Sequence, residues 1–366
     1  LKQLDPYFET VGDSESIPDN NVSALAQDAS GFIWIGTPAG LLRYDGYRFR
    51  SFAGDDGDAR SLAGDFVRSL LSARDGRLWI GTNADGVAVI EGNTARVTRV
   101  RAGANGLSSN TVRALAEDAS GGVWIGTREG LDHWPRGEAG VRQYRQRFGA
   151  HGNVDDDHIT ALLVDVEGNL WVGSWGGLSV LRHNASSFER VDRLDAASDP
   201  DEREQVQSLL QLSDGTIIVG TARSGTLALT PGSSALRPIP DGQANRSAVQ
   251  PAVLSLLEPR PGILWIGVFG GIDVLDARSF RLLRQIRPNS AVASSLAHDQ
   301  IRSMLRDQAG EIWVGGYGGG LQRHNPANDG IGVLRHSPGR PDTLSAPSVS
   351  SVLEVEDGRI WVGTRG

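Results

Sequence analysis

The hydrophobic pattern of the chain is a succession of short apolar runs separated by glycine-rich and polar turns, without helical periodicity. The first run of a group is typified by Val112-Arg113-Ala114-Leu115-Ala116, and turn pairs such as Asp75-Gly76 follow it. These residues suit a tight hairpin because both tolerate positive φ. Later runs in a group resemble Leu41-Leu42-Arg43-Tyr44 and the segment 47–52. We therefore predict groups of four short antiparallel strands.

These groups repeat along the whole chain. A signature of tryptophan, an aliphatic residue and glycine returns at spacings of 45, 45, 47, 47, 47, 48 and 48 residues. It stands at Trp34-Ile35-Gly36, Trp79-Ile80-Gly81, Trp124-Ile125-Gly126, Trp171-Val172-Gly173, Ile218-Val219-Gly220, Trp265-Ile266-Gly267, Trp313-Val314-Gly315 and Trp361-Val362-Gly363. Several short strands in a repeat of this length are typical of a β-propeller blade rather than a helical solenoid.

Small residues recur in the same register. A further glycine stands three residues before each signature, as Gly31 does before Trp34, and we expect it to close the hairpin between the first two strands. The glycine that ends the signature is expected where the second strand stops and a loop bends. Alanine or serine recurs in every first strand, as at Ala24 and Ser69, where strands converge on the channel axis. We interpret the tryptophans as scaffold that fills the wedge between blades.

The number of blades follows from the two ends of the repeat. Only three residues follow the eighth signature, and the opening stretch 7–11 resembles a lone fourth strand. We predict an all-β, seven-bladed β-propeller of four-stranded antiparallel blades over residues 1–345. Residues 346–366 would then be the first strands of a following blade or of a second propeller. The alternative is an eight-bladed ring closed by the N-terminal strand.

Composition excludes several classes of protein. Hydrophobic residues make up 39% and charged residues 22% of the chain, which is the balance of a globular protein. No apolar run is long enough to span a bilayer, so we expect no membrane contact by this segment. The net charge of −8 argues against nucleic acid as a partner, and the absence of cysteine excludes thiolate chemistry.

The repeat text resembles the two-component regulator propeller family. The resemblance is specific in units such as 107–131 and 21–47, with text such as Glu117-Asp118-Ala119-Ser120-Gly121-Gly122-Val123-Trp124-Ile125-Gly126. It is weaker around Ile218, where tryptophan is missing, and around Pro259-Arg260-Pro261-Gly262, where the acidic turn is lost.

The resemblance implies a periplasmic ligand-sensing domain of a bacterial membrane sensor. In that family the propeller belongs to hybrid histidine kinases or diguanylate cyclases, and often two propellers occur in tandem. The expected partners are a small-molecule or oligosaccharide ligand and a homodimer formed through the parent protein. This fragment itself is expected to be no enzyme and to need no cofactor.

Two other functions stay open at the level of sequence. One is a propeller hydrolase or lyase, and the other is a protein-interaction platform. The lyase that opens cyclic streptogramins shares the propeller shape, but no general base is placed here to carry that chemistry over. The aspartate of the sialidase repeat and the Trp-Asp pair of WD40 repeats are both missing at the corresponding positions.

Loops at one channel mouth are the expected place for a ligand. The loops between strands two and three and those between blades lie on the same face, and function on such scaffolds resides in loops. Aromatic rings among glycines could stack on sugars or apolar ligands, and basic side chains in these loops could bind anions. The candidates in the loops between strands two and three are Arg128, Trp175, Arg223, Phe269 and Tyr317.

A second set of candidates opens the first strands. Arg68, Arg113 and Arg302 occupy equivalent positions there, with Thr160 and Gln207 in the same register. Three guanidinium groups at one mouth could hold carboxylates, phosphates or sulfates in bidentate fashion. The alternative is ion pairing between blades, with Asp65, Asp157, Glu204 or Asp299.

The sequence contains few residues in patterns that would indicate catalysis or metal binding. The histidines lack metal-ligand spacing, and no phosphate-binding loop or nucleophile elbow is present. The acidic stretches 55–58 and 155–157 carry oxygen ligands but not the spacing of a dedicated calcium loop. We therefore expect no catalytic residues and no metal site.

Overall fold

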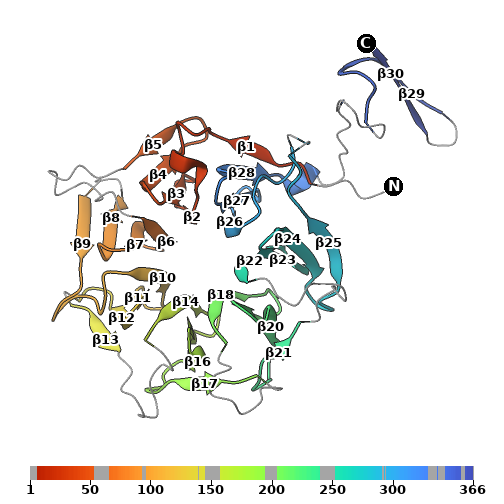
Figure 1. The fold of residues 1–366 in the computed structure, drawn as a ribbon. Helices are drawn as coiled ribbons and strands as arrows, with labels where there is room; N and C mark the ends of the chain where they lie inside the picture. The colour runs from red at the N-terminus through yellow and green to blue at the C-terminus, as the bar shows by residue number, and fades with distance from the viewer. Residues whose placement is uncertain are drawn as a thin grey trace.

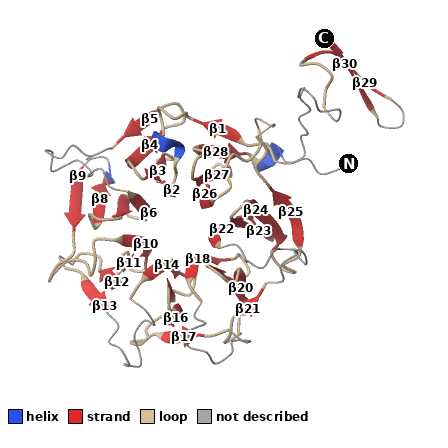
Figure 2. Cartoon of the chain, in the orientation of Figure 1, coloured by secondary structure: helices blue, strands red, loops and turns tan. Residues whose placement is uncertain are grey.

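The computed structural model of the chain is a closed ring of seven β-sheets around a central channel (Figure 1). It describes residues 6–52, 66–92, 96–138, 140–144, 157–193, 204–239, 252–290, 292, 294–328, 336, 343–355 and 359–365. Regular structure in these ranges is almost all strand, apart from short 3-10 helices such as Pro18–Asn20 and Pro326–Asn328 (Figure 2). No helix in them is long and apolar enough to cross a membrane.

Each blade is a four-stranded antiparallel sheet whose first strand lies nearest the channel. Blade 1 contains β2 (Ala24–Gln27), β3 (Ile33–Thr37), β4 (Gly40–Tyr44) and β5 (Phe49–Ser51), and blade 2 contains β6 (Val67–Ser72), β7 (Arg77–Thr82), β8 (Val87–Glu91) and β9 (Arg96–Val100). Blade 3 contains β10 (Val112–Glu117), β11 (Val123–Thr127), β12 (Gly130–Trp134) and β13 (Arg142–Tyr144), and blade 4 contains β14 (Ile159–Val164), β15 (Leu170–Ser174), β16 (Gly177–Leu181) and β17 (Glu189–Val191). Blade 5 contains β18 (Val206–Gln211), β19 (Ile217–Thr221), β20 (Thr226–Leu229) and β21 (Arg237–Pro238), and blade 6 contains β22 (Val253–Arg260), β23 (Ile263–Val268), β24 (Gly271–Asp276) and β25 (Leu282–Ile286).

Blade 7 closes the ring by combining three strands from residues 301–324 with one strand from the N-terminal region. Its inner strands are β26 (Ile301–Arg306), β27 (Ile312–Gly316) and β28 (Leu321–His324), and its outer strand is the N-terminal β1 (Glu9–Val11). β1 pairs antiparallel with β28, with Thr10 opposite Gln322. The seven-bladed prediction is therefore confirmed, and the eight-bladed alternative is excluded because the N-terminal strand completes the seventh sheet.

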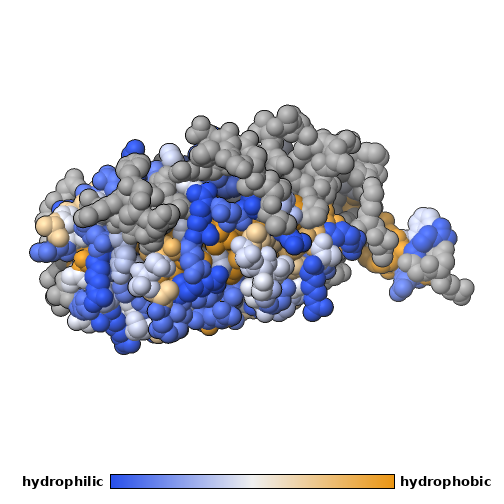
Figure 3. Space-filling view, turned by 90° about the horizontal axis from the view of Figure 1, so that it is seen from below, coloured by the Kyte–Doolittle hydropathy of each residue, from blue (hydrophilic) through white to orange (hydrophobic). Residues whose placement is uncertain are grey.

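The eighth signature forms a hairpin outside the ring. β29 (Ser348–Glu354) and β30 (Ile360–Arg365) pair only with each other (Figure 1). Trp361 is 62% exposed here, whereas the other signature tryptophans are buried, and apolar side chains show on the hairpin at the right of Figure 3. That these residues begin another blade or a second propeller stays a prediction.

One packing contact recurs at all seven seams between blades. The glycine that ends each signature faces the branched residue that precedes or opens the first strand of the next blade. A Cβ on Gly36 would lie 2.7 Å from Val67, and one on Gly126 would lie 2.6 Å from Ile159. The same contact joins Gly315 of blade 7 to Val22 of blade 1. These glycines therefore lie within the second strand and allow neighbouring blades to approach closely. The prediction that they mark the end of the strand, where a loop bends, is wrong.

The small residues of the first strands also serve the seams. Ser208 and Ser255 donate hydrogen bonds to the backbone oxygens of Val253 and Ile301 in the next blade, at 3.3 and 2.9 Å. These two hydroxyls therefore link neighbouring blades, and crowding at the channel axis stays a prediction. The glycines before the signatures do close hairpins, with φ of 88° at Gly31.

The tryptophans fill the wedges between blades, as predicted. Trp79 is 1% exposed and belongs to an apolar cluster that includes Val112 and Ile125 of the next blade. In three blades the indole N–H also donates to the aspartate of the first hairpin. These pairs are Trp34 with Asp28, Trp171 with Asp165 and Trp313 with Asp307, at 2.7, 2.8 and 2.8 Å.

The seam contact predicts the effect of adding one methyl group. Gly126→Ala should lower the free energy of unfolding by about 1–3 kcal/mol, because the new Cβ would overlap Ile159 in a packed core. Gly103→Ala is the matched control, since nothing lies within 4 Å of a Cβ there. Denaturant midpoints measure both effects, and equal midpoints for the two variants would contradict the close-approach role.

Candidate ligand site at the channel mouth

The inner strands carry a β-bulge at one shared position. In six blades the register shifts around the second residue of the first strand, as between Val67 and Ser69. The residues in these bulges are Arg68, Arg113, Thr160, Gln207, Leu254 and Arg302, and Ser23 holds the same place before β2. A bulge re-aims its extra side chain while the residues on either side keep their packing.

These seven side chains converge on one cavity. Together with Phe66 and Tyr317 they line a space of about 140 Å³ at the mouth of the channel. Four predicted site residues are thereby brought together, namely Arg68, Arg113, Arg302 and Tyr317. Sequence reasoning did not select Ser23, Leu254 or Phe66. The signal for the first two was available, because they share the register of the arginines.

Positive charge is concentrated on one side of this ring. Blades 7, 2 and 3 contribute Arg302, Arg68 and Arg113, whereas blades 4 to 6 contribute neutral side chains. Burial lowers the pKa of Arg113, and the nearby charges of Arg68 and Arg128 lower it further. Burial likewise lowers the pKa of Arg68, and Arg302 adds to that effect. The guanidinium groups therefore repel one another in a partly desolvated space.

The three arginines have few acceptors of their own. Arg68 Nε donates to Asn83 Oδ1 at 2.6 Å, but the buried Nε groups of Arg113 and Arg302 have no hydrogen-bond partner among the described residues. No ion pair joins any of the three to a carboxylate within the residues that the structure describes. Because buried donors are usually satisfied, this arrangement suits an anion that supplies the missing acceptors.

The alternative of ion pairing between blades receives little support. Glu204 instead pairs with Arg193, at 2.5 Å. Asp65 lies outside the described residues, as do the acidic stretch 55–58 and residues 155 and 156. Among the described residues, no group of three or more His, Asp or Glu side chains is placed to hold a metal ion.

Aromatic rings orient two of the arginines. The Arg68 guanidinium lies 4.5 Å from the centre of the Phe66 ring, and that of Arg302 lies 4.7 Å from the centre of the Tyr317 ring. Such cation–π contacts fix a side chain without neutralising its charge. The cations are therefore held in place and remain available to an anion.

The other predicted residues lie outside this cavity. Trp175 is 44% exposed and stacks on His158, with 3.9 Å between ring centres. Phe269 is 46% exposed, and Arg128 and Arg223 are exposed in the loops that follow β11 and β19. Arg128 is close enough to lower the pKa of Arg113. Ligand contact by these four residues stays a prediction.

The comparisons with known proteins agree with this architecture. The family model for the two-component regulator propeller matches residues 16–39, 61–84, 106–129, 153–176, 295–318 and 343–366. These six units are two-component regulator propeller repeats. The repeat units without a match are those around Ile218 and Trp265, and these two units have the sequences that depart most from the repeat. No curated protein sequence matches the chain.

Solved structures share the fold at low identity. Two are extracellular domains from B. thetaiotaomicron, of proteins described as the hybrid two-component systems BT3049 and BT4673. They show TM-scores of 0.75 and 0.73 and identities of 19% and 18%, over 98% of this chain. The propeller covers 52% and 51% of those chains, so it spans about half their length. Virginiamycin B lyase from Staphylococcus aureus gives 0.64 at 13% identity, over 86% of this chain and 98% of its own.

A buried histidine beside the mouth gives the propeller a pH dependence. His298 precedes β26 and is fully buried, beneath the loop that holds Gly316 and Gly319. Burial lowers its pKa from 6.5 to about 4, so the folded chain prefers the neutral ring. Folding stability should therefore be complete above pH 6.5 and fall by up to about 3 kcal/mol as the pH drops toward 4.

Unfolding curves across this pH range test the histidine. His298→Asn should flatten the loss of stability between pH 6.5 and 4, because no ring remains to take up a proton. His183→Asn on the outer part of blade 4 is the control and should keep the loss. An unchanged slope in His298→Asn would assign the acid sensitivity to other groups.

Proposed function

We propose that this propeller is the ligand-binding domain of a bacterial membrane signalling protein and that it binds an anionic small molecule or an acidic saccharide at the channel mouth. The observation that carries the proposal is the convergence of Arg68, Arg113 and Arg302 on one cavity without a carboxylate partner in the described chain. Three cations kept together at the cost of mutual repulsion favour an anionic occupant.

The rest of the ring suits a ligand with both a charged and an uncharged part. Gln207 offers an amide opposite the arginines, and Leu254 and Tyr317 offer apolar surface. Thr160 is already engaged, since its hydroxyl donates to the Val206 oxygen at 2.6 Å. A compact acid with hydroxyl groups would place its charge on the arginine side and its remaining polar groups toward Gln207.

The repeat family supports the signalling part of the proposal. The similar B. thetaiotaomicron domains are described as extracellular parts of hybrid two-component systems. By analogy, the propeller would lie outside the inner membrane, in the periplasm, and its parent protein would carry a histidine kinase or diguanylate cyclase output. Ligand binding would then alter the packing of blades or of a dimer and bias the membrane segment.

Binding without turnover is favoured over catalysis at this site. The described residues that line the cavity include no carboxylate and no imidazole. A lyase or hydrolase would need a general acid or base within hydrogen-bond reach of its substrate. The similarity to virginiamycin B lyase is a similarity of fold, and it assigns no catalytic role to any residue that lines this cavity.

Calorimetric titration with matched anionic and neutral compounds tests the ligand class. Glucuronate and glucose 6-phosphate should bind more tightly than glucose, and their affinity should fall as salt is raised. Arg113→Gln should weaken binding by roughly ten- to a hundredfold, because it removes a charge-assisted hydrogen bond of about 1.5–3 kcal/mol. Binding of glucose as tight as that of the acids would contradict the proposal.

Two controls separate the loss of a contact from the loss of the fold. Arg237→Gln changes an exposed arginine of β21 that does not line the cavity and should leave affinity unchanged. Arg113→Gln should not lower the melting temperature of the empty protein, since it relieves both burial of charge and repulsion from Arg68. Full affinity in Arg113→Gln would remove this residue from the site.

The reading frame that contains this chain tests the signalling role. We expect it to encode a membrane-spanning helix together with a histidine kinase or a diguanylate cyclase domain. A frame that encodes neither output would contradict this part of the proposal, while leaving the anion-binding part to the titrations.

A further inference from the structure

Blade 6 lacks the acidic turn that anchors the signature tryptophan in blades 1, 4 and 7. In blades 1, 4 and 7 an aspartate six residues before the tryptophan accepts the indole N–H. The corresponding residue in blade 6 is Pro259, which is buried and offers no side-chain acceptor. Trp265 Nε1 donates to no acceptor within the part of the chain that the structure describes. This N–H group is therefore available to water or to a ligand beside the blade 6 turn.

Blade 2 provides an instructive contrast. There the aspartate is replaced by Ala73, and the Trp79 indole N–H is also without a partner. That group is buried, and the ring of Trp134 packs edge-on against Trp79 with 5.1 Å between ring centres. In blade 6, by contrast, Trp265 lines a groove.

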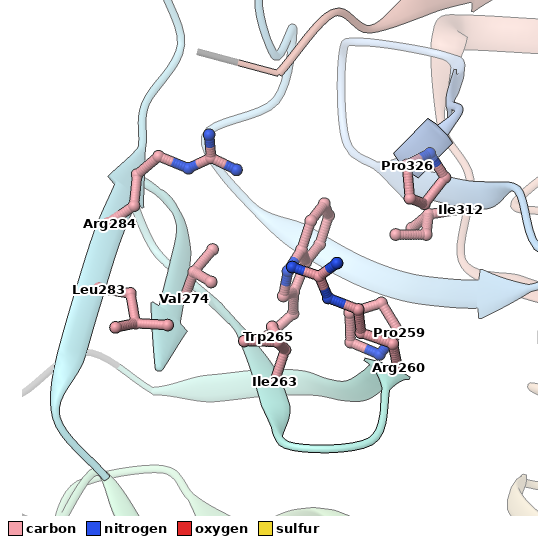
Figure 4. Close-up of a pocket in the computed structure, with 9 residues that line it drawn as sticks. All are labelled: Pro259, Arg260, Ile263, Trp265, Val274, Leu283, Arg284, Ile312 and Pro326. Atoms are coloured by element: carbon pink, nitrogen blue, oxygen red, sulfur yellow. The ribbon is translucent and has the colours of Figure 1, made fainter. Parts of the chain in front are cut away.

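This groove lies at the seam between blades 6 and 7, on the face opposite the channel mouth. It encloses about 90 Å³ and is formed by Trp265 together with Pro259, Arg260, Ile263, Val274, Leu283, Arg284, Ile312 and Pro326. Figure 4 shows Arg284 on β25 and Arg260 at the end of β22 on opposite sides of the groove, with the Trp265 indole between them. The lining is mainly apolar, and both charged residues in it are cations.

The seam also lacks a hydrogen bond that closes other seams on this face. At four seams, an acid or amide at the end of a first strand accepts a backbone N–H from the turn of the preceding blade. These pairs are Gln27 with Gln308, Glu117 with Arg74, Gln211 with Val166 and Glu258 with Ser213. Between blades 6 and 7 the two positions hold Arg260 and Arg306, so no acceptor is present. Two arginines therefore stand where four other seams have a hydrogen-bonded pair, and the positive charge at this turn is not neutralised by an acid of the seam.

We propose that this groove is a second binding site and that it takes a small amphipathic carboxylate. The carboxylate of the ligand would accept hydrogen bonds from Trp265 Nε1–H and from the Arg260 guanidinium. It would thereby supply from outside the acceptor that Asp28, Asp165 and Asp307 provide within their own blades. A phenyl-sized or branched aliphatic body would contact Ile263, Val274 and Ile312.

The size and the charge of the groove limit the occupant. A volume of about 90 Å³ holds one small apolar group, and a larger ligand would extend into solvent. Arg260 is exposed and pairs with no carboxylate in the described residues, so a ligand anion meets no competing acid there. A neutral aromatic compound would fill the apolar part but leave the indole N–H and Arg260 without an acceptor.

Phenylacetate and its neutral isostere phenylacetamide are the probes for this site. With the whole chain labelled with ¹⁵N, the indole cross-peak of Trp265 is assigned by its loss in Trp265→Phe. Phenylacetate should shift that cross-peak in a saturable manner, and phenylacetamide should bind at least about tenfold more weakly, as expected for a charge-assisted hydrogen bond. The absence of a saturable shift, or equal affinities for the two compounds, would overturn the proposal.

Two variants change the hydrogen-bond acceptors and donors at the groove. Pro259→Asp restores the residue of the other blades, so its own carboxylate should take the indole N–H and abolish phenylacetate binding without loss of thermal stability. Arg260→Gln should weaken binding by about tenfold or more, because it removes a charge-assisted hydrogen bond to the carboxylate. Phenylacetate binding by Pro259→Asp at wild-type affinity would also overturn the proposal.

Matched controls separate this site from the channel mouth. Arg278→Gln removes an exposed arginine of blade 6 that does not line the groove, and it should leave the phenylacetate titration unchanged. Arg113→Gln should likewise leave the Trp265 shift unchanged, because it belongs to the cavity on the other face. Weakening by Arg113→Gln would place phenylacetate at the mouth and refute a separate groove site.

Discussion

The structure depends on one close contact, repeated at every seam, between a glycine without a Cβ and a branched side chain of the next blade. A four-stranded sheet of two- to eight-residue strands buries too little surface to persist alone. Each blade therefore gains its stability from both neighbours, as in other repeat folds. Because Gly315 meets Val22 in the same way, the last seam is chemically equal to the others. The ring can close without a special joint, and β1 completes the outer edge of blade 7.

The same arrangement explains why binding residues can vary around the channel. In blade 5, for example, the branched Val206 and the small Ser208 on either side of the bulge are both committed to seam contacts. Between them the bulge places one side chain that neither packs in a core nor pairs across the strands. Charge at this position can therefore change without loss of the scaffold. The cluster of arginines on one side of the ring uses that freedom.

Blade 6 illustrates the converse, in which a change in the scaffold itself opens a site. Loss of the turn aspartate leaves the Trp265 indole N–H without an acceptor in the described chain, and two arginines replace a hydrogen-bonded pair at the seam. In blades 1, 4 and 7 the indole N–H is paired within the chain, as that of Trp171 is with Asp165. A departure from the repeat that would only destabilise an isolated blade can be tolerated in a ring, because the other seams hold the geometry. The open seam can then serve a ligand.

The sequence by itself determined the repeat, the strand order within each blade, the number of blades and the common register of Arg68, Arg113 and Arg302, because all of these are periodic and local. It did not determine that the signature glycines act across seams, since a Cβ clash with Val67 exists only when two blades meet. Nor did it separate Tyr317, which reaches the cavity, from Trp175, which stacks on His158 instead. Both rings stand among glycines in equivalent loops, but Trp175 meets His158 whereas Tyr317 lies against Arg302, and these are contacts between residues distant in sequence. Tertiary structure alone decided which side chains share a cavity, because convergence around a channel brings together residues more than two hundred positions apart in the chain, such as Arg68 and Arg302.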